Sequence, residues 1–129
     1  MELRNLYVVN YIIDGCKNTD LYIFDSPSLA ERRKERIEVR FSTNPDFEGA
    51  VVETHKLVYD RNCGIDTVYR VDYIKNSEIY SSMFYNSSLR AEKKYNEIMN
   101  TIITTDIELE KFNVITNQKL NAELPDLEY

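Results

Sequence analysis

The chain has 129 residues, the length of one ordinary domain, and 43% of them are hydrophobic and 29% charged. That composition is typical of a folded globular protein. Three glycines and three prolines are too few for a collagen-like chain, a flexible linker or a Gly-rich phosphate loop. The formal net charge is −6, so the chain should repel the phosphate backbone, and we expect no direct binding to duplex DNA.

The N-terminus and the cysteines bear on the cellular compartment. Residues 1–10 (MELRNLYVVN) lack the basic and long apolar regions of a signal peptide. No apolar run approaches the roughly 20 residues that a membrane-spanning helix needs. Cys16 and Cys63 are therefore expected to be free thiols in a cytoplasmic protein that has no membrane partner.

Two strands are predicted in the first 24 residues. Residues 6–13 (LYVVNYII) and 21–24 (LYIF) are dense in β-branched and aromatic side chains. The polar segment 14–20 (DGCKNTD) between them has the composition of a turn. We expect these segments to form a β-hairpin with a loop of about six residues.

A helix start follows this hairpin directly. Ser26 is placed to cap the helix, and Pro27 fits its first position. The helix should continue to about residue 41, because apolar residues recur four or eight positions apart on one face: Leu29, Ile37 and Phe41. Basic residues dominate its other sides.

The segment 44–59 is ambiguous between helix and strand. Its first residues, Asn44, Pro45 and Asp46, have the form of a second helix start. Apolar residues then recur at near-helical spacing, but the same stretch contains the Val, Thr, Leu and Tyr of a strand. The spacing favours a helix, and a strand is the alternative.

The second half of the chain begins with two further predicted strands. Residues 67–75 (TVYRVDYIK) alternate in polarity, so Arg70 and Asp72 should share a face toward water. The opposite face would carry Tyr69, Val71 and Tyr73. After a turn, residues 79–84 are expected to form the next strand.

A second helix should follow these strands. Asn86 or Ser87 is placed to cap it, and it should run to about Ile103. Its apolar stripe consists of Ala91, Tyr95, Ile98, Met99 and Ile102. The segment 106–120 fits either a helix or a strand, and both alternatives stay open.

The two halves of the chain resemble each other. Residues 7–12 (YVVNYI) are similar to 69–74 (YRVDYI), and residues 24–29 (FDSPSL) are similar to 84–89 (FYNSSL). Such an echo indicates a duplicated strand-strand-helix unit. Coincidence is the alternative, because any unit of this kind selects Tyr, Val, a capping Ser and charged residues.

From these elements we expect an α+β fold with an antiparallel sheet and helices. The chain should form a single compact domain over residues 1–129, built from ββα repeats at 6–41 and 67–103. One strand-strand-helix unit has a sheet face that it cannot cover alone, so two such units are expected to pack together. Residues 121–129 have the character of an acidic tail.

The repeated motifs also resemble those of small domains common in phages and bacterial mobile elements. Those domains open with a YVV-x-Y-like strand and place F-x-S-x-x-x-A at the turn from strand to helix. The matching residues here are 7–11 and 24–30, and the resemblance covers about half of the chain when both copies are counted. It implies the strand-strand-helix fold and a phage-like origin, and it carries no catalytic residues.

Catalytic and metal-binding chemistry finds little support in the sequence. His55 is the single histidine, which excludes any two-His metal motif, and Cys16 and Cys63 are isolated from it and from each other. The spacing of Glu53 and Lys56 departs from that of PD-(D/E)-x-K nucleases, because two residues intervene instead of one. We therefore expect no enzymatic activity, no catalytic residue, no metal site and no cofactor.

Two charged regions are the candidate binding surfaces. The first predicted helix carries a basic cluster that fits an anion: Arg32, Arg33 and Arg36. A solvated helix face with internal ion pairs is the alternative for this cluster. The last third of the chain is acidic, and three of its residues would steer the protein toward a basic target: Asp106, Glu108 and Glu110.

Tyrosines are the candidate anchors of an interface. The chain has ten of them, and Tyr is enriched among residues that dominate binding energies. Two are expected to be exposed near the second hairpin: Tyr80 and Tyr85.

These features together favour a small acidic binding protein without catalytic activity. With a phage-like architecture, the leading expectation is an inhibitor that occupies a basic surface of a host defence or toxin protein in the host cytoplasm. One alternative is a binder that sequesters a phosphorylated small-molecule signal, and a further one is an immunity protein against a toxin. A homodimer is also left open.

Overall fold

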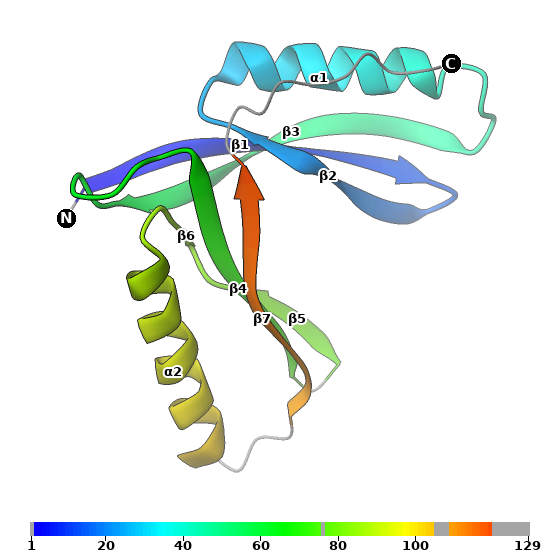
Figure 1. Ribbon diagram of the computed structural model, residues 1–129. Helices are drawn as coiled ribbons and strands as arrows, with labels where there is room; N and C mark the ends of the chain where they lie inside the picture. The colour runs from blue at the N-terminus through cyan, green and yellow to red at the C-terminus, as the bar shows by residue number, and fades with distance from the viewer. Residues whose placement is uncertain (1, 76, 105–108, 120–129) are drawn as a thin grey trace. The chain divides into compact units, whose positions relative to one another are not determined.

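The computed structural model describes residues 2–75, 77–104 and 109–119 (Figure 1). In chain order the elements are β1 (Glu2–Ile13), β2 (Cys16–Phe24), α1 (Pro27–Arg40), β3 (Phe47–Tyr59), β4 (Thr67–Lys75), β5 (Glu78–Ser81), β6 (Phe84–Tyr85), α2 (Ser88–Thr104) and β7 (Leu109–Lys119). The strands pair mostly in antiparallel orientation, and the fold also contains two helices. The predicted α+β class is confirmed.

The chain divides into two compact units. Among the described residues, the α1 unit comprises residues 5–55 and 119, and the α2 unit comprises residues 2–4, 56–75, 77–104 and 109–118. In the α1 unit the strand order is β2-β1-β3. In the α2 unit the end of β3 pairs in parallel with β6, β4 pairs with both β5 and β6, and β7 also pairs with β4.

The hairpin of the α1 unit turns over two residues instead of six. Asp14 and Gly15 have φ angles of 50° and 74°, which is the pattern of a type I′ turn, and Ile13 pairs directly with Cys16. The predicted loop 14–20 was wrong, because the Asp-Gly pair suffices for the turn. The polar residues after it extend β2 instead.

Helix α1 matches its prediction closely. Ser26 caps it by accepting a hydrogen bond of 3.4 Å from the backbone N–H of Leu29, and Phe41 is the C-cap. Figure 1 shows α1 (cyan) lying along the strands of its unit. The buried residues at the centre of this packing are Val9, Phe24, Ala30 and Ile37.

The segment 47–59 is a strand, so the favoured helix was wrong. β3 is rich in β-branched residues, and Gly49 at its start has a φ of 137°, which no helix allows. At its other end the adjacent residues Leu57 and Val58 are both buried, so the strand is covered on both faces. The near-helical spacing of its apolar residues was coincidental.

Strand β4 has its predicted bounds, but it lacks a face open to water. Val68 and Val71 lie on opposite faces and are both fully buried. Arg70 and Asp72 form an ion pair of 2.9 Å whose side chains are only 21% and 19% exposed. The expected second strand of this hairpin is interrupted, so that β5 and β6 each pair with β4.

Helix α2 begins one residue after its cap. Ser87 Oγ accepts a hydrogen bond of 3.3 Å from the backbone N–H of Arg90, as expected of a capping serine. Ala91 is fully buried, whereas Tyr95, Ile98 and Met99 are half-buried. The segment 106–120, left open by the sequence, contains strand β7.

The two units repeat one order of elements. Strands β1 and β2, helix α1 and strand β3 correspond to β4, the interrupted β5/β6 strand, α2 and β7. Phe24, Ser26 and Ala30 have their counterparts 61 residues later in Tyr85, Ser87 and Ala91. This register differs by one residue from the sequence alignment of Phe24 with Phe84. The origin of the two units by duplication, and their union in one domain, stay predictions.

Candidate functional site

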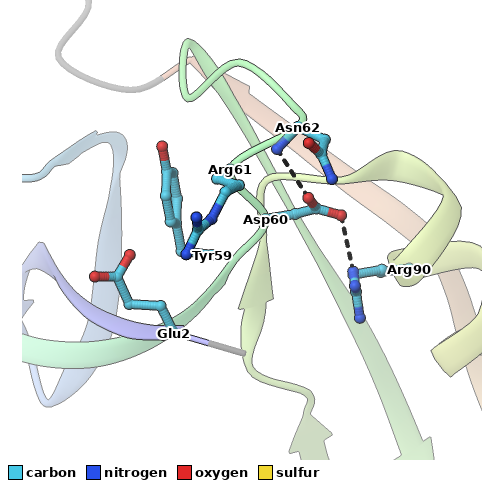
Figure 2. A pocket seen from close by; sticks show the side chains of 6 residues that line it. All are labelled: Glu2, Tyr59, Asp60, Arg61, Asn62 and Arg90. Atoms are coloured by element: carbon cyan, nitrogen blue, oxygen red, sulfur yellow. Dashed lines mark hydrogen bonds and ion pairs between the residues drawn. The ribbon is translucent and has the colours of Figure 1, made fainter.

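Two surface pockets of the α2 unit share the side chain of Arg90. The first has a volume of about 240 Å³ and is shown in Figure 2; its lining residues are Glu2, Tyr59, Asp60, Arg61, Asn62 and Arg90. The second has a volume of about 220 Å³ and is lined by Val58, Met83, Tyr85, Arg90, Lys93, Lys94 and Glu97. Arg90 is therefore the residue that links the two.

Asn86 fixes the loop on which the first pocket is built. Its amide nitrogen Nδ2 donates to the backbone carbonyls of Asp60 (2.8 Å), Cys63 (3.3 Å) and Gly64 (3.1 Å). Its Oδ1 accepts from the backbone N–H of Asp60 at 2.7 Å, and the residue is only 4% exposed. A buried amide with four such bonds holds the loop between β3 and β4 in one conformation.

Asp60 in turn orients Arg90. Its Oδ1 accepts a hydrogen bond of 2.9 Å from the backbone N–H of Asn62, and its Oδ2 accepts one of 3.0 Å from Arg90 Nε, the two dashed lines of Figure 2. The Asn62 N–H, and then the Arg90 guanidinium, hold the pKa of the Asp60 carboxyl below its usual range. Asp60 is thus a fixed negative charge that positions one cation.

Tyr59 forms another part of the first pocket. The guanidinium of Arg4 lies 3.6 Å from the centre of its ring, a cation–π contact, and Arg4 also pairs with Glu2 at 3.2 Å. One face of the Tyr59 ring is therefore covered, and the carboxylate of Glu2 is already neutralised by a cation.

The second pocket joins an apolar base to a basic rim. Val58 and Tyr85 are buried, and burial followed by the nearby charge of Glu97 raises the pKa of the Tyr85 phenol, so it is a neutral hydroxyl group at physiological pH. Lys93 is exposed and Lys94 is half-buried on the adjacent turn of α2.

Three cations at these pockets have no counter-charge in contact. Arg61, Lys93 and Lys94 form no hydrogen bond or ion pair with any residue among 2–75, 77–104 and 109–119 whose side chain is described. Over both pockets, four cations face three carboxylates, and two of those carboxylates, Glu2 and Asp60, are paired. On a chain of net charge −6 this is a local positive region.

The basic cluster predicted on α1 is not one surface. Arg32 and Arg36 are exposed, but Arg33 is buried at 7% exposure and pairs with Asp20 at 2.7 Å. The alternative of a solvated helix face does not hold for Arg33, because it forms a buried ion pair with a carboxylate on β2. The amphipathic pattern gave no sign of this pair.

The predicted tyrosine anchors differ from each other. Tyr80 is half-buried, stacks on Tyr73 with ring centres 5.4 Å apart, and donates a hydrogen bond of 2.6 Å to Glu78. Tyr85 is 9% exposed and packs against Val58 and Ala91, so the expectation that it is exposed was wrong. Of the acidic candidates, Asp106 and Glu108 lie outside the described residues, and Glu110 lies in β7, where its side chain is not described.

The sequence missed Arg61 and Asn86 as parts of a site. The sequence does contain one signal for this site. An Asp-Arg-Asn turn at residues 60–62 precedes a hairpin, and the helix after that hairpin has Arg90 in its first turn. Only the fold shows that these segments meet.

The residues considered for catalysis are divided between the two units. Cys16 is exposed on β2 of the α1 unit, and Cys63 lies in the loop of the α2 unit. His55 Nε2 lies 3.9 Å from a carboxylate oxygen of Glu53. Among the residues described, no three His, Cys, Asp or Glu side chains are grouped to hold a metal ion.

Comparison of the chain with protein-family models, with curated proteins and with solved structures gave no match. Neither helix in the described part of the chain has the length and apolar character needed to cross a bilayer.

Proposed function

We propose that the protein binds a phosphorylated small molecule at the paired pockets of the α2 unit. The observation that carries this proposal is the group of three cations without counter-charges, Arg61, Lys93 and Lys94, around the fixed Arg90. Arg and Lys side chains are the usual ligands of phosphate in proteins, and charge-assisted hydrogen bonds to phosphate are stronger than neutral ones.

Each pocket would contribute a different part of the binding. Lys93 and Lys94, which lie next to each other on α2, would neutralise one phosphate group as point charges. Arg61 would contact a second phosphate group in the first pocket. Because Asp60 fixes Nε of Arg90, the guanidinium is oriented before the ligand arrives, and less entropy is lost on binding.

The shape of the site favours a ligand with two phosphate groups or a diphosphate. Because both pockets share Arg90, a diphosphate bound beside it would bring one phosphate group to the cations of each pocket. The apolar side chains of the second pocket, the buried Val58 and the exposed Met83, provide a surface for the organic part of such a molecule. The role that follows is stoichiometric capture of a phosphorylated signal.

The test is thermal unfolding and calorimetric titration with ADP, GDP, pyrophosphate and inorganic phosphate. A ligand of the native state raises Tm in proportion to the logarithm of its concentration. We expect the diphosphates to raise Tm and to bind with a salt-dependent Kd. Lys93→Gln with Lys94→Gln should weaken binding by about tenfold or more, as the loss of two charge-assisted contacts requires.

One double variant of α1 provides the matched control. Arg32→Gln with Arg36→Gln also removes two exposed helical cations, but from the α1 unit, and should leave diphosphate binding unchanged. No Tm change with any of the four compounds, or equal losses in the two double variants, would refute the proposal.

A second candidate function is an inhibitor that occupies a surface of a partner protein. The observation that favours it is β5, the last strand in the order of its unit, whose Ile79 side chain is 76% exposed. Among the described strands β5 pairs only with β4, and a strand edge left open in this way, with an exposed apolar side chain, suits strand addition by a partner. In that case Tm would rise only with the partner, and Ile79→Lys would abolish the effect while diphosphates leave Tm unchanged.

A further inference from the structure

A third pocket, in the α1 unit, contains a buried arginine whose hydrogen-bonding capacity is incompletely used. It has a volume of about 290 Å³ and is lined by Tyr11, Asp20, Arg33, Ile37, Arg40 and Phe41. These residues come from β1, β2 and α1 and from the C-cap of α1. None of them belongs to the pockets of the α2 unit.

Arg33 is held in one orientation by two partners. Its Nε lies 2.7 Å from one carboxylate oxygen of Asp20, and its Nη2 lies 3.2 Å from the other, so the pair is bidentate. The guanidinium also lies 4.8 Å from the centre of the Tyr22 ring. Both members of the ion pair are 8% exposed as side chains.

The remaining nitrogen of this guanidinium, Nη1, is enclosed and has no hydrogen-bond partner. Two other buried polar atoms in the described part of the chain share that status, Arg70 Nε and Asp72 Oδ1, but they lie 2.9 Å from each other. Arg33 Nη1 has no such neighbour. A buried donor without an acceptor is costly, and more so on a charged group, so an acceptor is the expected complement.

We propose that the α1 pocket binds a small aromatic carboxylate, with one carboxylate oxygen accepting a hydrogen bond from Arg33 Nη1. The guanidinium of Arg33 favours an anionic acceptor, because hydrogen bonds between two charged groups are stronger than those with a neutral acceptor. The ion pair with Asp20 already places one carboxylate beside it, which favours a monoanion over a dianion. A phosphate dianion would instead be repelled by the Asp20 carboxylate that grips the same guanidinium.

The walls of the pocket select the aromatic part. Tyr11 and Phe41 stack with ring centres 5.4 Å apart, and Phe41 continues the stack to Phe47 at 5.7 Å. An aromatic ring inserted beside them extends the series of offset-stacked rings, which such side chains favour. Ile37 completes the apolar lining.

Entry requires a movement at the rim, because Nη1 is enclosed. Arg40 is exposed at the end of α1, whereas Phe41 is stacked between Tyr11 and Phe47, so a rotation of the Arg40 side chain would disturb the core least. Binding is then expected to shift the signals of these residues together with those of Asp20 and Arg33.

The test uses the full chain with benzoate, benzamide and phenyl phosphate as probes, followed by calorimetry and ¹H–¹⁵N correlation spectra. Benzoate should bind saturably in the millimolar range and shift signals around the α1 pocket. Benzamide has the same shape without the charge and should bind about tenfold more weakly, as should the phenyl phosphate dianion.

Substitutions at the rim separate this site from a structural role of the arginine. Arg40→Gln and Phe41→Leu leave the buried Arg33–Asp20 pair in place, and each should weaken benzoate binding several-fold while the fold is retained. Arg32→Gln on the exposed side of the same helix is the matched control and should leave binding unchanged.

Four outcomes would overturn the inference: no binding of benzoate, equal binding of benzamide, tighter binding of phenyl phosphate, or the same affinity in Arg40→Gln as in Arg32→Gln. Lys93→Gln with Lys94→Gln should not affect benzoate. Failure at the α1 pocket is therefore distinguishable from failure of the diphosphate site.

Discussion

The α1 and α2 units place a cation at the same position of their helices and use it differently. Arg33 on α1 has its counterpart in Lys94 on α2, 61 residues later. Arg33 is buried against Asp20, but the position that corresponds to Asp20 is Ser81, an exposed residue without charge. One carboxylate on the neighbouring strand thus decides whether the helix cation becomes part of the core or stays at a surface pocket.

The residue before the helix N-cap also differs between the two units in whether it is buried. Asn86 in the α2 unit is buried and fixes the loop between β3 and β4 through four hydrogen bonds. Its counterpart Asp25 in the α1 unit is exposed. A neutral amide can be buried when its donors and acceptors are satisfied, whereas a carboxylate needs a cation to compensate the loss of water.

The largest effect is expected from breaking the buried ion pair. Arg33→Ala leaves the Asp20 carboxylate buried without its partner and should destabilise the protein by about 3–5 kcal/mol. Lys94→Ala at the corresponding position should change stability by less than about 0.5 kcal/mol, because a half-exposed cation without a partner contributes little. Urea unfolding of both variants measures the difference.

A double variant tests the cause. Asp20→Leu with Arg33→Met replaces the pair by apolar residues and should recover most of the loss. If Arg33→Ala and Lys94→Ala lower the free energy of unfolding equally, then burial of the Arg33–Asp20 pair does not distinguish the two cations.

A smaller effect is expected from the isoleucines that correspond on the two helices. Ile37 is 2% exposed, so Ile37→Ala should cost about 2–4 kcal/mol through lost transfer energy and the cavity that remains. Ile98 is half-buried, and Ile98→Ala should therefore cost about half as much. Equal losses in urea would show that Ile98 is buried like its counterpart.

Next in size is the loss of the loop anchor. Asn86→Ala removes four hydrogen bonds and leaves the backbone groups of Asp60 without those partners, so we expect a loss of about 2 kcal/mol. Asp25→Ala should cost less than about 0.5 kcal/mol, as is usual for an exposed site. Amide exchange provides a second measurement: protection should fall in the loop 60–64 for Asn86→Ala and should not change there for Asp25→Ala.

The sequence predicted elements better than it predicted partners. Helix α1, its Ser26 cap and the bounds of β4 follow from local signals, because capping and alternation depend on neighbouring residues. The burial of Arg33 and the anchoring by Asn86 depend on carboxylates and carbonyls 13 and 22–26 residues away. Composition and periodicity carry no information on such pairings.

Strand β3 is an element that local signals predicted wrongly. Its local spacing favoured a helix, and only the pairing with neighbouring strands decides for a strand. The pocket pair has the same origin, since the residues around Asp60 and those of α2 come together through β6, which pairs with both β3 and β4. What the fold brings together could not be predicted from either segment alone.

The smallest effect concerns the pH dependence of the α2 unit. The pKa of Asp60 is lowered in the folded protein, first by the Asn62 N–H and then by Arg90. A folded-state pKa below the unfolded one, which is about 4, means that the charged carboxylate stabilises the fold above that pH. This contribution is lost as the pH falls through the lower, folded-state value.

Asp60→Asn should therefore reduce the fall in Tm that occurs when the pH is lowered from 6 to below the unfolded-state pKa of about 4. Asn keeps an acceptor for the Asn62 N–H but lacks the charge that faces Arg90, so the variant isolates the electrostatic part. Asp25→Asn, which removes an exposed carboxylate from the α1 unit, controls for the change in net charge. The Tm of both variants is measured at each pH at low salt, where exposed pairs are least screened. If the two variants lose the same amount of acid sensitivity, then the contact between Asp60 and Arg90 does not stabilise the pocket, and Arg90 is not held in place before a ligand binds.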